Sequence, residues 1–402
     1  MNSNLESLYK IAQKPSRTII GLMSGTSLDG LDVALCEISG AGEYTEIKLI
    51  QFETVDYSEN IKLDIKSIFA KDTIEFRKLV LLNEWIGTLH AEMILKCLDK
   101  WKITADKVDL IASHGQTVFH APKILHQQEK FPNGTLQIGD GDHIAVKTGI
   151  MTISDFRQKH VAAGGEGAPL AVYGDYFLFS KKGENRIMLN MGGISNFTYL
   201  PASNNPEEVF VTDTGTGNTL IDAFTKLNFP EKSYDKDAEI AKTGTVNAAL
   251  LESLKSDSFF NKPYPKTTGP ELFNMEYVKK AQALSSTQNI PVPDLLATLT
   301  RFSAETIATA IKETIKSTIY NIEDFIIYLS GGGAHNPLLI QWLKELLTCN
   351  FAKTDDLGIS GDAKEAILFA ILANETVSGG KSDFGKRKGI PSVSMGKISF
   401  PN

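Results

Sequence analysis

The stretch GLMSGTSLDG, residues 21–30, follows a short apolar run and is rich in small residues and hydroxyl groups. Backbone N–H groups of a glycine-rich turn can approach phosphate oxygens, and Ser and Thr hydroxyls add donors. The stretch matches neither the GxxxxGK(S/T) pattern of a P-loop nor the GxGxxG pattern of a dinucleotide site. A phosphate-binding loop and a structural turn are equal alternatives on these residues alone. The candidate phosphate contacts are Ser24, Gly25, Thr26, Ser27 and Gly30.

Asp213 opens the stretch DTGTGN, which follows the apolar run EVFVT. A carboxylate placed after a buried strand can take a proton from water or a hydroxyl group as a general base. It can also hold Mg²⁺ through a water molecule. The alternative is a helix N-cap, which Asp favours, although Gly215 and Gly217 separate it from the helical pattern that follows. Asp213 is therefore a candidate catalytic base.

Two further glycine-rich stretches follow apolar runs, NMGGISN at residues 190–196 and GGGAHN at residues 331–336. Consecutive glycines cost backbone entropy, which makes sense where a ligand lies against the chain. Flexible strand-to-helix turns are the alternative. Gly192 and Gly193 could approach a phosphate, and the neighbouring asparagines could donate to it or lock the loop.

Isolated polar residues provide weaker candidates. Gln116 and His114, in SHGQT, could bind a sugar hydroxyl or a carboxylate, although a lone His after a strand is more often structural. Arg157 could pair with an acidic ligand or form an ordinary salt bridge. Glu365 is expected early on a helix, where a surface Glu is routine.

Strand and helix patterns alternate along the chain, which predicts an α/β fold. Residues 18–23 and 31–39 read as paired strands around the first loop, and apolar residues recur at helical spacing over residues 76–100. Because ligands of open α/β sheets bind at the carboxyl ends of strands, the glycine-rich loops could converge on one cleft.

The length, net charge and cysteine content of the chain limit the classes of protein to which it can belong. The chain has 402 residues, a net charge of -7 and three cysteines, and no apolar run reaches the ~18 residues of a membrane helix. The negative charge argues against a general nucleic-acid binder. The three cysteines are odd in number and far apart, which disfavours disulfides, so a cytoplasmic protein is expected. The length predicts two domains: residues 1–150 with the phosphate loop, and residues 151–384 with Asp213 and the other glycine loops. The C-terminal segment, about residues 385–402, is expected to pack on the first domain.

The chain resembles anhydro-N-acetylmuramic acid kinases, of the sugar kinase/Hsp70/actin superfamily, from about residue 18 to its C-terminus. The matching segments are GLMSGTSLDGLDVAL, SHGQTVFH, LQIGDGDHIA, SDFR, AAGGEGAPL, NMGGISN, DTGTGN, YDKD, KTTGPELFN and GGGAHN. The resemblance implies a two-domain actin-like (ribonuclease H-like) fold, with ATP in a central cleft. It also implies a homodimer, a sugar substrate and a role in cell-wall sugar recycling.

The resemblance further implies the chemistry. Asp213 matches the base that activates water to open the 1,6-anhydro ring, after which O6 takes the γ-phosphate of ATP, with Mg²⁺ carried by the nucleotide. Gln116, Arg157 and Glu365 are the expected sugar contacts. The expected ATP contacts are Ser24, Gly25, Thr26, Ser27, Leu28, Asp29, Gly30, Leu31, Gly192, Gly193, Gly215, Gly217, Asn218, Gly331, Gly332, Gly333 and Asn336.

This chain departs from the family pattern at several positions. The usual DFRRRD is DFRQKH here, so Gln158 and His160 replace an Arg and an Asp. The missing Arg is a plausible partner for the lactyl carboxylate of the sugar, and Lys159 does not reproduce its bidentate fork. Thr216, Gly141 and Pro270 are further departures. The alternatives are therefore a kinase of another 1,6-anhydro sugar and a non-catalytic ATP-binding sugar sensor.

Overall fold

The computed structural model describes residues 2–167, 170–359, 361–379, 383–385 and 389–402. Two residues of AAGGEGAPL, Ala168 and Pro169, and residues 386–388 of the expected C-terminal segment lie outside this range. The chain divides into two compact units. Unit 1 comprises Met1–Leu178 and Asp362–Asn402, and unit 2 comprises Phe179–Gly361. Each described unit is an α/β layer structure, as the alternating sequence patterns predict.

Unit 1 is built on a mixed sheet whose described strands have the order β12-β6-β4-β1-β2-β3, with β5 paired to β4. The expected hairpin around the first loop is confirmed, since β1 and β2 pair antiparallel from Ser16↔Ser39 to Met23↔Asp32. The strands are β1 (Ser16–Ser24), β2 (Gly30–Ser39), β3 (Glu46–Asp56), β4 (Leu110–Ala121), β5 (Gly134–Ile138), β6 (Thr152–Ser154) and β12 (Lys397–Ser399).

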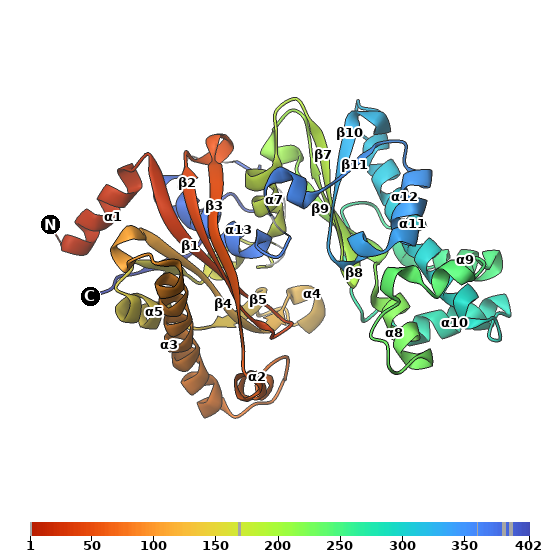
Figure 1. Cartoon of the computed structure of the whole chain (residues 1–402), viewed down its shortest axis with the longest axis horizontal. Helices are drawn as coiled ribbons and strands as arrows, with labels where there is room; N and C mark the ends of the chain where they lie inside the picture. Colours follow the sequence, from red (N-terminus) through yellow and green to blue (C-terminus); the bar gives the residue numbers. More distant parts are fainter. Residues whose placement is uncertain (1, 168–169, 360, 380–382, 386–388) are drawn as a thin grey trace. The chain divides into compact units, whose positions relative to one another are not determined.

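Helices cover both faces of this sheet. The helical spacing predicted over residues 76–100 is confirmed by α3, which lies along one face (Figure 1). Helix α13 packs on the other face, where Gly21 meets the backbone of Ala366. The helices of unit 1 are α1 (Ser3–Gln13), α2 (Glu59–Lys66), α3 (Phe76–Trp101), α4 (Lys123–His126), α5 (Gly141–Thr148), α6 (Phe156–Ala162), α7 (Ala171–Phe179, which ends one residue into unit 2) and α13 (Lys364–Ser378).

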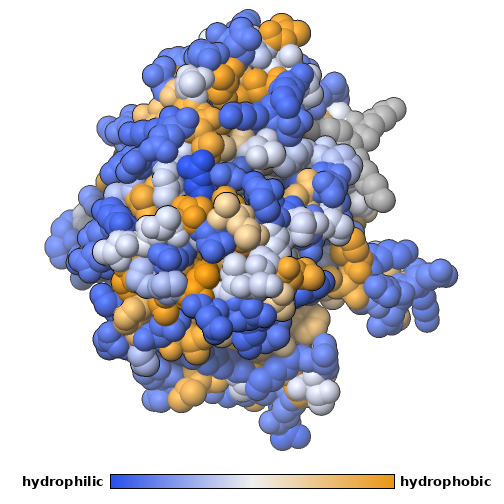
Figure 2. All heavy atoms as spheres, turned by 90° about the vertical axis from the view of Figure 1, so that its right-hand side faces the viewer, coloured by the Kyte–Doolittle hydropathy of each residue, from blue (hydrophilic) through white to orange (hydrophobic). Residues whose placement is uncertain are grey.

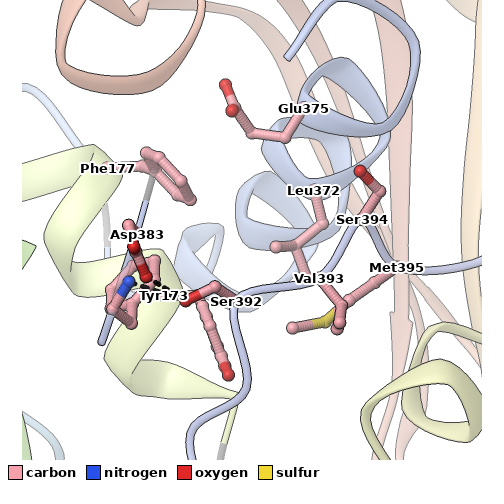
Figure 3. Close-up of a pocket in the computed structure, with 10 residues that line it drawn as sticks. Tyr173, Phe177, Leu372, Glu375, Asp383, Ser392, Val393, Ser394 and Met395 are labelled. Carbon is pink, nitrogen blue, oxygen red and sulfur yellow. Dashed lines mark hydrogen bonds between the residues drawn. The ribbon is translucent and has the colours of Figure 1, made fainter. Parts of the chain in front are cut away.

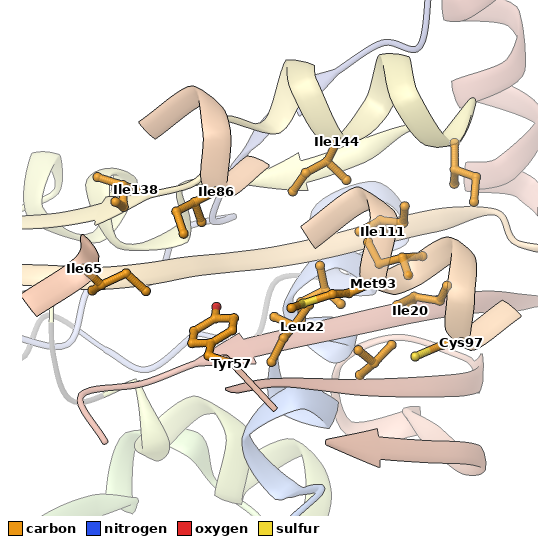
Figure 4. Close-up of a cluster of buried hydrophobic side chains, with 14 of the residues drawn as sticks. Ile20, Leu22, Tyr57, Ile65, Ile86, Met93, Cys97, Ile111, Ile138 and Ile144 are labelled. Atoms are coloured by element: carbon orange, nitrogen blue, oxygen red, sulfur yellow. The ribbon is translucent and has the colours of Figure 1, made fainter. Parts of the chain in front are cut away.

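The core of unit 1 lies between the sheet and α3 (Figure 4). Ile20 and Leu22 point into it from β1, because alternate residues of a strand face the same side. Ile86 and Met93 meet them from α3. Each large apolar side chain buried here contributes roughly 1.5–3 kcal/mol. Tyr57 differs from the other side chains of this cluster, because it carries a hydroxyl group that needs a hydrogen-bond partner inside the protein.

Unit 2 contains a second mixed sheet with the described order β11-β10-β7-β8-β9. Strands β7, β9 and β10 run in the same direction, because β10 is parallel to β7 and two antiparallel pairings connect β7 to β9. Their carboxyl ends therefore share one edge of the sheet. The strands are β7 (Asn185–Met191), β8 (Ile194–Leu200), β9 (Phe210–Thr216), β10 (Phe325–Ser330) and β11 (Asn350–Lys353). The helices are α8 (Thr219–Asn228), α9 (Ala248–Lys255), α10 (Met275–Ser285), α11 (Val292–Lys316) and α12 (Pro337–Leu346).

The division between the units differs from the expected boundary near residue 150. Residues 151–178 and 362–384 were expected in the second domain but belong to unit 1. The reason is strand pairing and helix packing: β6 pairs with β4, and α13 packs on β1 and β4. In the C-terminal segment, β12 pairs with β6 within unit 1.

Two strands also extend further than expected. SHGQT reads as a loop in the sequence, yet it lies within β4, which continues to Ala121 and pairs with β5. Strand β9 likewise continues to Thr216, so Asp213 lies inside the strand rather than after it. The strand pairing is irregular near both segments. Each strand contains a glycine with a positive φ at this irregularity, Gly115 in β4 and Gly215 in β9.

The surface shown in Figure 2 is dominated by hydrophilic side chains, and its hydrophobic side chains form small separate groups. Within the described ranges, none of the helices combines the length and apolar character that a membrane crossing requires.

Candidate active site

The loop between β1 and β2 presents its small polar residues to solvent. Thr26, Ser27 and Asp29 are exposed, whereas Leu28 between them is 4% exposed. Leu28 has a φ of 60°, a left-handed conformation that is uncommon for a residue with a branched side chain. The buried leucine thus anchors the loop while the adjacent hydroxyl groups face outward.

Ser24 differs from the other loop residues because its hydroxyl points into the protein. Its Oγ lies 2.6 Å from Gln116 Oε1, 2.8 Å from the Tyr57 hydroxyl and 3.0 Å from the Gly30 carbonyl oxygen. Gln116 is also directed inward: its Nε2 donates to the carbonyl oxygens of Gly25 (2.8 Å) and Thr117 (2.9 Å). Gln116 therefore secures the loop, a role that its place in the sequence did not indicate, and its contact with a sugar stays a prediction.

Arg157 lies in a partly buried polar group beside β4. Its Nε donates to His114 Nε2 at 2.9 Å, and Nη1 donates to the Gly167 carbonyl oxygen at 2.6 Å. Burial lowers the pKa of Arg157 to about 10, and nearby Glu365 opposes this change. Glu365 keeps a surface open to solvent but is otherwise closely surrounded by protein, so desolvation raises the pKa of its carboxyl while Arg157 lowers it. The structure thus brings these two predicted sugar contacts close together.

His160, one of the residues at which the resemblance to the family breaks down, holds the adjacent loop by a hydrogen bond. It is 1% exposed, and its Nδ1 accepts a hydrogen bond from the Gly167 amide at 2.9 Å. Burial, together with Arg157, lowers the pKa of His160 to about 4, so the ring is neutral near pH 7. Gln158 donates to the Thr135 carbonyl oxygen. These two departures from the family pattern are accommodated within unit 1 by backbone contacts.

Asp32 lies on β2, close to the candidate phosphate-binding loop. Burial raises the pKa of Asp32, and the neighbouring carboxylates of Asp362 and Asp29 raise it further. Thr54 donates to one oxygen of Asp32 at 2.6 Å. Within the described ranges, no three His, Cys, Asp or Glu side chains are grouped so that they could hold a metal ion.

Asp213 in unit 2 is half-buried and held by backbone groups. Its Oδ2 accepts from the Thr268 amide at 2.8 Å, and its own amide donates to the Lys266 carbonyl oxygen at 2.9 Å. Burial raises the pKa of the Asp213 carboxyl to about 6, the Thr268 amide offsets part of the rise, and Glu271 adds to it. The N-cap of α8 is Asn218, so the helix-cap alternative for Asp213 is wrong. A carboxylate that ionises near pH 6 is suited to accept a proton at neutral pH.

Lys266 supports Asp213 and was missed as an individual site residue. It is 7% exposed, and its Nζ donates to the carbonyl oxygens of Phe259 and Phe260. The same ammonium group lies 4.5 Å from the Phe259 ring centroid and 4.3 Å from that of Tyr264. Burial lowers the pKa of Lys266 to about 8. The aromatic residues around it, in SFFNKPYPK, are the sequence signal that could have indicated this cage.

The glycine-rich stretches of unit 2 pack against one another at the shared strand edge. Asn218 Nδ2 donates to the carbonyl oxygens of Met191 and Gly192, and the Gly217 amide donates to the Gly193 carbonyl oxygen. A Cβ at Gly331, where φ is 79°, would lie 2.6 Å from Asn190 Oδ1, and one on Gly333 would lie 2.6 Å from the Met191 side chain. Glycine is therefore required for this close packing.

The remaining candidates of unit 2 are placed as follows. Gly332 begins a short 3-10 helix, Gly332–His335, that leads into α12. Asn336 is the N-cap of α12, where its Oδ1 accepts from the amides of Leu338 and Leu339. Gly215 lies in β9, two residues beyond Asp213. Asn218 and Asn336 thus form hydrogen bonds within the protein, so backbone N–H groups are the better candidates for ligand contacts here.

A cavity of about 450 Å³ lies elsewhere in unit 1, among α7, α13 and the segment after α13 (Figure 3). Leu372 and Glu375 line it from α13, and Tyr173 and Phe177 line it from α7. Glu375 accepts hydrogen bonds from the Gly42 amide and the Thr45 hydroxyl. None of the predicted site residues is among the described residues that line this cavity.

Comparison with known proteins identifies close relatives. Residues 17–398 match the protein family described as anhydro-N-acetylmuramic acid kinase. The chain is 55% identical to a protein of that name from Pseudoalteromonas atlantica and 52% identical to one from Pseudoalteromonas translucida, in each case over 100% of both chains. It is 39% identical to one from Caldanaerobacter subterraneus, over 98% of this chain and 100% of that protein.

Proposed function

Because the chain belongs to the anhydro-N-acetylmuramic acid kinase family, we propose that it is an ATP-dependent phosphotransferase acting on 1,6-anhydro-N-acetylmuramic acid. The products are N-acetylmuramic acid 6-phosphate and ADP, in the recycling of cell-wall sugar. A homodimer and a cytoplasmic location belong to this proposal and rest on the family alone. Sedimentation of the purified chain tests the dimer.

The single observation that best supports the chemistry is Asp213, a half-buried carboxylate that ionises near pH 6 and is oriented by the Thr268 amide. Asp213 takes a proton from water, and the water oxygen bonds to the anomeric carbon. The bond from that carbon to O6 breaks. O6 then bonds to the γ-phosphorus of ATP as the bond to the β–γ bridging oxygen breaks, and ADP leaves. A positioned general base contributes typically 10²–10⁴-fold to such a step.

In this proposal the loop Ser24–Leu31 of unit 1 offers backbone N–H groups to the phosphates of ATP, and the glycine-rich stretches of unit 2, considered by themselves, offer groups of the same kind. Such groups stabilise charge on a transferring phosphoryl group without reorganising during the reaction. Mg²⁺ enters with the nucleotide in this proposal and would offset the negative charge of the phosphates. Asp32, whose pKa is raised by burial and by neighbouring carboxylates, is a group of unit 1 whose charged form such a cation would stabilise.

The pH dependence of turnover follows from the raised pKa of Asp213. A base must be deprotonated to act, so kcat is expected to rise as the pH increases through about 6 and to level off above it. Below that value the rate should fall about tenfold per pH unit, since one proton is involved. The measurement is kcat at saturating ATP and sugar over a pH series. A rate that is constant from about pH 5 to 8 would contradict the assignment.

Arg157 is proposed to bind the lactyl carboxylate of the sugar. Two of its nitrogens already contact His114 and Gly167, which orient the guanidinium group, and Nη2 has no hydrogen-bond partner among the described residues. The variant Arg157→Lys keeps the charge but loses this geometry. We expect its KM for the lactyl sugar to rise about tenfold or more, as a charged hydrogen bond is worth roughly 1.5–3 kcal/mol.

The control for Arg157 is internal to the same variant. An uncharged 1,6-anhydro sugar without the lactyl group should show little change in KM between wild type and Arg157→Lys. Lys159→Ala, at an exposed neighbouring position, is the matched surface variant. An equal rise in KM for both sugars would mean that Arg157 stabilises the fold of the site rather than binding the lactyl carboxylate.

The proposed function is tested by ADP release with MgATP and a panel of sugars. Release that depends on 1,6-anhydro-N-acetylmuramic acid supports the proposal. Preference for an uncharged anhydro sugar would support the alternative that the changes at residues 158–160 have altered specificity. Binding of ATP without stimulation by any anhydro sugar would favour the sensor.

A further inference from the structure

Four polar side chains form a continuous chain of hydrogen bonds inside unit 1. Gln116, Ser24, Tyr57 and His90 are each at most 3% exposed. The distances are 2.6 Å from Gln116 Oε1 to Ser24 Oγ, 2.8 Å from Ser24 Oγ to the Tyr57 hydroxyl, and 2.7 Å from that hydroxyl to His90 Nε2. This series of hydrogen bonds therefore runs from the loop after β1 into the apolar core against α3.

The orientation of the Gln116 amide defines one end of this chain. Its nitrogen lies 2.8 Å from the Gly25 carbonyl oxygen and 2.9 Å from that of Thr117. Both are acceptors only, so the nitrogen must be at this position, and the amide oxygen must face Ser24. An exchange of the two amide atoms would place three oxygens against one another without a proton between them.

The positions of the protons then follow in order. Gln116 Oε1 has no proton, so the hydroxyl proton of Ser24 must lie in the 2.6 Å contact, and the Gly30 carbonyl takes at most a share of it. Tyr57 must then donate to Ser24, and His90 must donate from Nε2 to Tyr57.

The surroundings of His90 agree with this assignment. Its Nδ1 is buried and has no hydrogen-bond partner among the described residues, as expected for the unprotonated nitrogen of a neutral ring. An unpaired N–H at that position would be the costlier arrangement. Burial lowers the pKa of His90 to about 3, so the ring stays neutral at ordinary pH.

We infer that Tyr57 and His90 are positioning residues for the ATP loop, and that Ser24 is an internal anchor whose hydroxyl proton is committed to Gln116. The hydroxyl groups left for phosphate are those of Thr26 and Ser27, which are exposed. The ATP part of this inference rests on the proposed function, whereas the hydrogen-bond order does not.

The first test is the protonation of His90 by nitrogen-15 NMR on the full chain. The expected spectrum is that of a neutral ring protonated at Nε2 between about pH 5 and 8. The variant Tyr57→Phe should change the His90 shifts, because Nε2 loses its acceptor. A ring protonated at Nδ1, or shifts that do not respond to Tyr57→Phe, would overturn the hydrogen-bond order whether or not the protein is a kinase.

The second test is the Kd of MgATP measured by calorimetry, which requires no turnover. Tyr57→Phe is expected to weaken binding by roughly fivefold, the value of one buried hydrogen bond. Ser24→Ala should weaken binding to the same extent. The Kd of the double variant should be no higher than that of either single variant, since both substitutions interrupt the same series of hydrogen bonds. Thr26→Ala should weaken binding additively with Tyr57→Phe.

Tyr173→Phe is the matched control, because it also removes one buried tyrosine hydroxyl of unit 1, here the donor to the Pro391 carbonyl oxygen. It should lower thermal stability comparably and leave the Kd of MgATP unchanged. Equal effects of Tyr57→Phe and Tyr173→Phe on Kd would overturn the positioning role. If wild type binds no ATP, the proposed function fails, and the NMR result alone decides the hydrogen-bond order.

Discussion

Replacing Asp213 with Asn is expected to lower sugar-dependent ADP release by about 10²–10⁴-fold, the contribution of a positioned general base. The amide keeps the shape of the carboxylate and can still accept from the Thr268 amide, but it cannot take a proton from water. Initial rates at saturating ATP and sugar measure the effect. The KM values should change little, because the step that is lost is proton transfer.

Asp222 provides the matched control for Asp213. Burial raises the pKa of its carboxyl to about 6 as well, and it lies in the first turn of α8, the helix that follows β9. The variant Asp222→Asn should keep the rate within about twofold of wild type. An equal loss in both variants, or a fully active Asp213→Asn, would contradict the assignment of the base.

The Asp213 variant should also remain folded. Because the pKa of Asp213 is above its ordinary value in the folded protein, the wild-type carboxyl destabilises the fold as the pH rises through the interval up to about 6. Asp213→Asn removes that effect and should be at least as stable as wild type at pH 7. Its melting temperature therefore separates a lost base from a lost fold.

Gly21→Ala is expected to have the largest effect on stability. A Cβ at Gly21 would lie 1.9 Å from the carbonyl oxygen of Ala366, so β1 and α13 could not keep their present distance. Both are backbone elements of the unit 1 core, and neither can move like a flexible side chain. The loss should be about 3 kcal/mol or more in the free energy of unfolding, at the upper end of overpacking effects. Denaturant unfolding measures it.

Gly134→Ala is the corresponding control in the same sheet. A Cβ at Gly134 on β5 would approach its nearest neighbour, the Ala121 carbonyl oxygen, to 3.7 Å, an ordinary contact. We expect a change of less than about 1 kcal/mol in the free energy of unfolding. Similar losses in both variants would mean that the fit between β1 and α13 is not the cause.

The spacing of apolar residues correctly predicted those helices and strands that bury one face. Helix α3 and the β1–β2 hairpin follow from apolar spacing that is fixed by the chain itself. The division between the units was misplaced because it depends on β6 and α13 finding strands far away in the sequence. The length of β9 was underestimated because its pairing with β8 continues past Asp213, to glycine and threonine positions that do not read as a strand.

Side-chain direction explains the remaining differences at the site. Gln116, Asn218 and Asn336 are polar residues in suitable segments, so the sequence favours them as ligand contacts. In the structure each of them secures backbone groups, because unpaired carbonyls and amides in these tight turns need partners, and its contact with a ligand stays a prediction. Tyr57 and His90 were not singled out at all, since their connection to Ser24 spans distant parts of the chain.

The most direct test of the central claim is mass spectrometry of the sugar product formed from 1,6-anhydro-N-acetylmuramic acid, MgATP and the wild-type chain. The account predicts a product that has gained one water and one phosphoryl group, formed in equal amount to ADP. A product that has gained water alone, or ADP formed while the anhydro sugar stays intact, would contradict the assignment of ring opening and phosphoryl transfer to this protein.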